Sequence, residues 1–103
     1  MRVASEWTFL TNHSHVLLTI AATPEVTLRE VAVRVGITER AAQRILADLV
    51  EGGYVEAERV GRRNRYKVNG DMPLRHAIER NNPVSALVAL VKPPVRKGRQ
   101  VTS

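Results

Sequence analysis

The sequence contains no cysteine and no apolar run long enough to cross a membrane. The absence of thiols excludes disulfides and thiolate metal sites, and it suits a reducing cytoplasm. The apolar run at residues 16–22 is far too short to span a bilayer, and no signal peptide precedes it. We therefore expect a cytoplasmic protein without a membrane partner.

Motifs typical of enzymes and of metal sites are missing as well. There is no glycine-rich phosphate loop, no nucleophile elbow and no HExxH motif. His13 and His15 are two residues apart, which on a helix separates them by about 200°, and His76 is remote. Glu56 and Glu58 fall on one face of a predicted strand opposite basic residues, so an ion-pair ladder explains them better than acid–base catalysis. We expect no enzyme activity, no metal and no cofactor.

The 103 residues suffice for one domain with a modest core. The net charge of +6 is unevenly spread: residues 1–91 hold 12 basic against 10 acidic residues, whereas residues 92–103 hold four basic residues and no acidic one. Net basicity favours a polyanionic partner, although a solubilising role explains the tail equally well. We expect residues 1–91 to form the folded domain and residues 92–103 to form a disordered basic tail.

The first two helices are predicted from their caps and their apolar spacing. Thr11 can cap a helix over residues 12–23. Thr27 and Glu30 form a capping box at the start of the second helix, and Gly36 ends that helix in the left-handed conformation. The apolar stripes that these helices would bury are Leu17, Ile20 and Ala21 in the first, and Leu28, Val31, Ala32 and Val35 in the second.

A third helix follows, capped by Thr38 and ended by Gly52-Gly53. The small Ala32 lets the third helix cross close to the second, while Ala42 and Ile45 fix the pair at a steep angle. The apolar face of the third helix is Ala42, Ile45, Leu46 and Leu49. We therefore predict a helix-turn-helix, for which a helical hairpin in an ordinary bundle is the alternative.

The outer face of the third helix combines long polar side chains with small ones. Its residues are Arg40, Ala41, Gln43, Arg44 and Ala47. Arginine can pair with guanine and glutamine with adenine, while Thr38 and the helix N-terminus suit a phosphate. The small alanines let the helix axis approach a base edge closely. This face predicts that the third helix reads DNA.

A β-hairpin is predicted after the third helix, with strands at residues 54–60 and 65–69 and a turn at residues 61–64. Its tip is rich in arginine, which suits the minor groove or the DNA backbone. The tip residues are Arg62, Arg63, Asn64 and Arg65. Because a lone hairpin is marginal in water, we expect it to be held by the helical body or by a third short strand near Val26. A short helix is predicted over residues 74–80.

The two ends of the domain carry much apolar surface. Residues 1–10 form an N-terminal arm, whose Trp7, Phe9 and Leu10 should pack on the body or on a partner chain. Residues 84–91 are apolar at nearly every position, as in a helix that is buried on more than one side. We predict a homodimer formed through the N-terminal arm and this C-terminal helix. The alternative is that the two segments cover each other within one chain.

The segment GITERAAQRILADLVEGGYV, followed by GRRNRY, resembles the winged-helix transcriptional regulators of the broad MarR and ArsR type. The resemblance covers about residues 11–69 and implies a twofold dimer on DNA. It implies that the helix at residues 38–52 lies in the major groove and that the wing at residues 54–69 touches the adjacent backbone or minor groove. The implied contacts are Thr38, Arg40, Ala41, Gln43 and Arg44 in the groove and Arg62, Arg63 and Asn64 at the wing. The chain lacks the cysteines of many metal-sensing ArsR-type proteins and is shorter than typical MarR proteins.

The predicted fold is therefore α+β and mostly helical: a winged helix-turn-helix with three core helices, a β-hairpin wing and an extra C-terminal helix. Its predicted function is sequence-specific binding of double-stranded DNA as a transcriptional regulator, most often a repressor in such families, at the nucleoid. One alternative is a winged helix used only for protein association. Another is binding of RNA, or of any nucleic acid, through the tail. No residue indicates a small-molecule effector.

Overall fold

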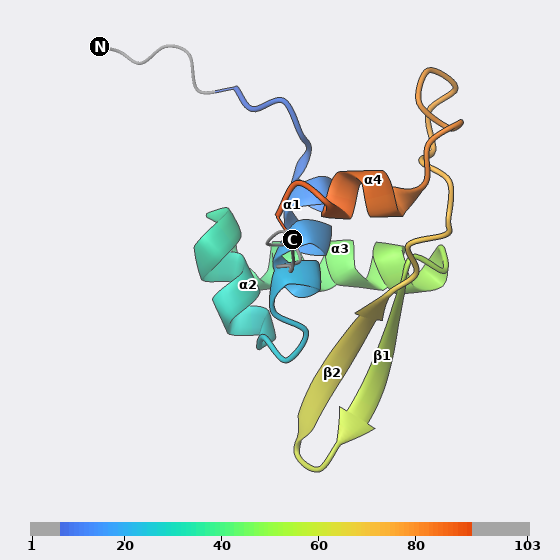
Figure 1. The fold of residues 1–103 in the computed structure, drawn as a ribbon. Helices are drawn as coiled ribbons and strands as arrows, with labels where there is room; N and C mark the ends of the chain where they lie inside the picture. Colours follow the sequence, from blue (N-terminus) through green and yellow to red (C-terminus); the bar gives the residue numbers. More distant parts are fainter. Residues whose placement is uncertain (1–6, 92–103) are drawn as a thin grey trace, which may run out of the picture.

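The computed structural model describes residues 7–91, which contain four helices and two strands. In chain order these are α1 (Asn12–Ala22), α2 (Leu28–Val35), α3 (Glu39–Glu51), β1 (Val55–Val60), β2 (Arg63–Val68) and α4 (Val84–Val88). The first three helices pack on one another, the antiparallel β1–β2 hairpin projects away from them, and α4 packs on α1 (Figure 1). This order and packing confirm the predicted winged helix-turn-helix.

The three core helices begin at the predicted threonine caps. The hydroxyl of Thr11 accepts from the Ser14 amide at 3.2 Å, and that of Thr38 accepts from the Ala41 amide at 3.0 Å. At the start of α2 the capping box is complete, because Thr27 accepts from the Glu30 amide at 3.1 Å and the Glu30 carboxylate accepts from the Thr27 amide at 2.9 Å. Each such cap contributes about 1 kcal/mol to stability.

The core lies between α1 and the α2–α3 pair, and the base of the hairpin closes it. Val16 and Ala42 are fully enclosed, and Val31 of α2 is buried beside them. Val55 and Tyr66 bring the two strands into the same cluster. No polar or charged side chain is buried among residues 7–91, so the polar residues of this region lie where a partner can reach them.

The wing has a tighter turn than predicted. Val60 pairs with Arg63, so only Gly61 and Arg62 lie between the strands, and the predicted turn over residues 61–64 is wrong. Gly61 has φ 63° while Arg62 does not have a positive φ, as in the two-residue turns that suit the right-handed twist of a hairpin. Arg63 and its neighbour Asn64 are therefore strand residues.

The strand register that the predicted ion-pair ladder of the wing needs is present, but its ion pairs are not formed. Glu56 pairs in register with Lys67 and Glu58 pairs with Arg65, as expected. Neither pair brings its charged atoms within 4.0 Å, and across residues 7–91 the one ion pair joins His13 to another element. Long exposed side chains gain little from such contacts in water, because ordering them costs entropy.

Of the two supports expected for the hairpin, the helical body is present and the third strand near Val26 is absent from the described residues. Its place is taken by one hydrogen bond, in which the Tyr66 amide donates to the Pro24 carbonyl at 2.9 Å. Because this bond joins the edge of β2 to the loop between α1 and α2, it still holds the wing against the helical body.

The predicted helix over residues 74–80 is wrong as well, because this stretch forms bends and turns. The Glu79 carboxylate accepts from the His76 amide at 2.9 Å, and the His76 ring accepts from the Ile78 amide at 3.0 Å. Side chains that bond nearby amides in this way compete with helix formation. The last helix is also shorter than the predicted residues 84–91 and ends at Val88.

Among the described arm residues 7–10, Leu10 packs on the body of its own chain and lies half-buried against the core. The side chains of Trp7 and Phe9 are 69% and 91% exposed. Figure 1 shows the arm running away from the helices. The basic tail at residues 92–103 lies outside the described residues.

Candidate nucleic-acid interface

The bend between α2 and α3 is built as the sequence predicted. Gly36 adopts φ 86°, a left-handed conformation that glycine enters without steric cost. The Ala32 carbonyl accepts from the amides of both Gly36 and Ile37, at 2.8 and 3.0 Å. Ile37 is half-buried against the core and closes the turn. The direction in which α3 leaves α2 is thus fixed by backbone bonds and by packing.

The outer face of α3 is polar and open to solvent. Ala42, Ile45 and Leu49 are buried on the inner face. Arg40, Gln43 and Arg44 are exposed at helical spacings of three and four, which places them on one face of the helix. The small residues next to them are Ala41, which is half-buried, and Ala47, which is exposed.

Thr38 differs from the other predicted groove residues because its hydroxyl oxygen already serves as the cap of α3. The amides of Glu39 and Arg40 have no intrahelical partner, as holds for the first residues of any helix. These amides and the helix dipole make the start of α3 chemically suited to an anionic oxygen. The negative charge of Glu39 lies in the same turn and opposes this attraction.

The tip residues of the wing are divided between its two faces. Because side chains alternate along a strand, Arg63 and Arg65 lie on one face, and Asn64 lies on the other, opposite Arg59. Arg62 lies in the turn itself. All five side chains are exposed. The four predicted wing residues are therefore close in sequence but do not form a single surface.

Arg59 is a basic residue of the wing tip that the sequence analysis missed. Its Nε atom donates to the Gly61 carbonyl at 3.2 Å, which holds the side chain near the turn. With the longer predicted turn, Arg59 would have paired with Tyr66 and not with Asn64. The signal that was available in the sequence is Gly61 itself, since a glycine at the first position suits a two-residue turn.

Arg63 is turned toward the helical body. Its Nη2 atom donates to the Glu25 carbonyl at 3.4 Å, across the junction between the wing and the loop before α2. The nearby Glu30 carboxylate is bonded by the amide and hydroxyl of Thr27, and these bonds lower its pKa below the ordinary value of 4.5. The positive charges of Arg34 and Arg63 lower this pKa further. Arg63 thus interacts with the body of the same chain as well as lying at the tip.

Metal ligands do not gather in this part of the molecule: across residues 7–91 no group of three or more His, Cys, Asp or Glu side chains is placed to hold an ion. None of the helices described between residues 7 and 91 is long and apolar enough to cross a membrane.

A helix-turn-helix with a basic outer face, followed by a wing with a basic tip, defines the winged-helix class of nucleic-acid-binding proteins. A model of the MarR family matches residues 8–65, from the arm into β2. The chain belongs to the MarR family, whose members are DNA-binding transcription regulators and not enzymes. A comparison with curated proteins found no match. This match confirms the predicted resemblance to winged-helix regulators of the MarR type.

Proposed function

We propose that this protein is a sequence-specific repressor that binds double-stranded DNA as a twofold dimer. The observation that carries the proposal is the exposed stripe of Arg40, Gln43 and Arg44 on a helix whose start, bend and inner face are all fixed. A rigid helix fixes the positions from which such side chains reach the base edges, so its backbone need not be ordered on binding.

In the proposed complex α3 lies in the major groove. Arg40 and Arg44 are suited to the O6 and N7 atoms of guanine, and Gln43 is suited to adenine. Ala41 and its neighbour Ala47 leave room for the helix to approach the bases. Thr38 and the free amides at the start of α3 would take a phosphate, which sets the register of the helix on the duplex.

The wing supplies the second contact. The side chains of Arg62 and Arg65 are exposed and make no hydrogen bond within residues 7–91, so we propose them for the adjacent backbone or minor groove. Asn64 lies on the opposite face of the hairpin, next to Arg59. It would reach the DNA strand that Arg62 and Arg65 contact only together with Arg59. Arg63 would contribute its charge while it holds the wing to the body.

Repression is the proposed mode, because a dimer seated in the groove excludes other proteins from the same stretch of DNA. The proposed dimer uses the N-terminal arm, α4 and the residues that follow α4, of which Leu90 and Val91 are exposed. A cytoplasmic protein associated with the nucleoid follows from this function.

Selection of bound duplexes from a random pool tests the proposal. We expect a consensus with twofold symmetry, whose half-sites are centred about 34 Å, or one helical turn, apart. A consensus without symmetry would contradict the dimer but keep sequence-specific readout. Absence of any consensus would contradict groove readout and would favour a winged helix that serves protein association or binds nucleic acid through its tail.

A further inference from the structure

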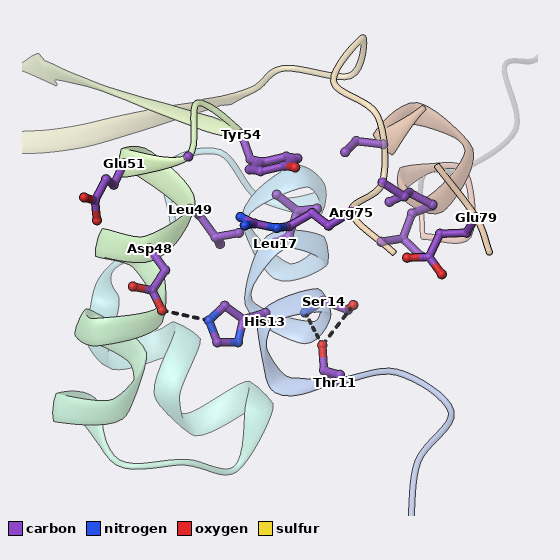
Figure 2. A pocket seen from close by; sticks show the side chains of 14 residues that line it. Thr11, His13, Ser14, Leu17, Asp48, Leu49, Glu51, Tyr54, Arg75 and Glu79 are labelled. Atoms are coloured by element: carbon purple, nitrogen blue, oxygen red, sulfur yellow. Dashed lines mark hydrogen bonds and ion pairs between the residues drawn. The ribbon is translucent and has the colours of Figure 1, made fainter. Parts of the chain in front are cut away.

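A hollow of about 690 Å³ lies between the start of α1, the end of α3 and the loop before α4. Leucines at positions 17, 49, 74 and 87 give it an apolar lining. Figure 2 shows Leu17, Leu49 and the ring of Tyr54 around its middle, with Asp48 and His13 joined on one side. The volume falls within the range of about 300–1,000 Å³ that is typical of specific binding sites.

The wall formed by Tyr54 is firmly held. Its hydroxyl donates to the Pro73 carbonyl at 3.3 Å, and the Arg75 guanidinium carbon lies 5.9 Å from the ring centroid. Gly52 is packed so closely beneath the ring that an added Cβ would lie 3.1 Å from two of its carbons. On the opposite rim the His13 Nε2 atom lies 2.9 Å from the Asp48 carboxylate.

The aromatic arm begins at this hollow but does not enter it. Thr11, the cap of α1, lines the hollow, and the arm precedes it directly. The rings of Trp7 and Phe9 contact each other edge to face at 4.9 Å, yet both remain largely exposed. Aromatic side chains usually bury about 150–250 Å² each, so this pair leaves a large apolar surface uncovered.

The arm is directed away from its own hollow by two local contacts. Leu10 packs against the core, and the Thr8 hydroxyl donates to the Leu10 carbonyl at 2.6 Å. Reaching the hollow of the same chain would require the backbone to reverse within the two residues between Thr8 and Thr11. A second copy avoids this reversal, because its hollow can lie where the arm already points.

We propose that two copies of this chain exchange arms, with Trp7 and Phe9 of one copy seated in the hollow of the other. The proposal rests on the dimer of the proposed function and names its contact. Residues 7–10 of the arm reach about 13 Å at most. The two hollows must therefore lie close together, with their rims facing each other across a twofold axis. One symmetric contact then covers both aromatic pairs and fills both hollows. Arg75 on the rim favours an aromatic occupant, since guanidinium groups stack on such rings.

Disulfide trapping between two differently labelled copies tests the exchange, because the natural chain has no cysteine. A Thr8→Cys copy, which keeps both rings, is mixed with an isotope-labelled Leu74→Cys copy and oxidised. We expect a covalent dimer that contains one copy of each kind. The control replaces Leu74→Cys by Ile78→Cys, since Ile78 is 85% exposed and does not line the hollow.

Two results would overturn the exchange. One is a yield of mixed dimer no higher than in the Ile78→Cys control. The other is a monomeric disulfide in a chain that carries both Thr8→Cys and Leu74→Cys, which would show each arm in its own hollow.

Sedimentation separates this inference from the dimer on which it rests. We expect Trp7→Ala with Phe9→Ala to weaken association at least tenfold and Ile78→Ala to leave it unchanged. Trp7 is the only tryptophan, so its emission should shift to shorter wavelength as the natural protein is concentrated. If the arm variant still forms a full dimer, arm exchange is wrong and the dimer stands. If the natural protein is a monomer throughout, both are wrong.

Discussion

Single side chains on the outer face of α3 have different parts in the proposed complex. Arg44 lies one turn beyond Arg40 and one turn before Ala47, so it is central on the outer face of α3. A central arginine can pair with both acceptors of one guanine, whereas a residue at the edge of the stripe also meets the backbone. The strongest loss of sequence preference is therefore expected at Arg44.

We predict that Arg44→Ala weakens binding to the selected operator by about 1–3 kcal/mol and relaxes preference at one base pair. Arg80→Ala is the matched control, because it removes the same charge from an exposed residue far from α3 in the chain. Titration of operator and of scrambled duplex with both variants measures the effect. Equal losses in the two variants would mean that only net charge matters.

Arg62 and Arg63 are adjacent, yet we predict different responses to their removal. Arg62→Ala should lower the salt dependence of binding by about one counterion, with the wing unchanged. Arg63→Ala should also loosen the wing, because it removes the bond to the Glu25 carbonyl. Backbone NMR relaxation of residues 60–65, measured beside the salt titration, distinguishes the two. Identical wing dynamics in both variants would contradict the role of Arg63.

The outward-facing residues of α3 could be predicted from the sequence, because the start of a helix and its apolar positions determine which residues share a face. Arg40, Gln43 and Arg44 follow from the cap at Thr38 and the apolar positions alone. The contact made by Arg63 could not be predicted in this way. Its partner, Glu25, lies 38 residues earlier, and only the packing of the wing against the helices brings them together.

Between the elements, the bend at Gly36 that joins α2 to α3 is the place where we expect a substitution to lower stability most. We predict that Gly36→Ala lowers the free energy of unfolding by about 1 kcal/mol or more, because alanine is strained at a positive φ. Nothing lies within 4 Å of an added Cβ there, so the loss reports backbone conformation and not a clash. Gly36→Asn should lose less, since asparagine tolerates this region better. Chemical denaturation of the three proteins gives the comparison.

The capping box of α2 should make stability depend on pH. Because folding lowers the pKa of Glu30, its contribution is complete above its ordinary value of 4.5 and is lost as the pH falls through the lower folded value. Glu30→Gln keeps an acceptor for the Thr27 amide but has no charge. We predict that the natural protein melts above this variant at neutral pH and that the gap closes in acid. A gap that is constant with pH would contradict the role of the charge.

Helix starts were predictable because each depends on residues within one turn. The same locality misled the prediction over residues 74–80. His76 and Glu79 are compatible with a helix by propensity, but their side chains bond nearby amides and hold a turn. The sequence left open whether the helical body or a third strand supports the hairpin. The loop at Pro24 makes a single backbone hydrogen bond to β2, and pairing of that kind depends on how the helices place the loop.

At the scale of the whole molecule, charge and association act together. Removal of residues 92–103 takes away four basic residues and no acidic one. We predict that this shortened chain loses part of its affinity equally for all duplexes and keeps its consensus, because phosphate contacts carry no sequence information. A tail of full length in which Lys92, Arg96, Lys97 and Arg99 are replaced by glutamine is the control. Loss of nearly all affinity in both would make the tail the main contact.

The hollow beside α1 was beyond sequence analysis, since its lining comes from residues 11–87 with no shared motif. The apolar arm was visible in the sequence, and the expectation that a partner covers it stays a prediction. In the proposed exchange the surface that covers the arm belongs to a second copy. No local sequence pattern determines how two copies of the chain dock.

Tyr54 lies at the joint between the two proposed DNA contacts, since it lies between α3 and β1. The same ring walls the hollow that would receive the partner's arm. An arm that presses on this ring restricts the angle between α3 and the wing. By thermodynamic reciprocity, DNA that fixes this angle would then tighten the pairing of the two copies by the same factor. Operator occupancy would rise more steeply than in proportion to protein concentration, so that a modest change in expression would switch the DNA between free and occupied.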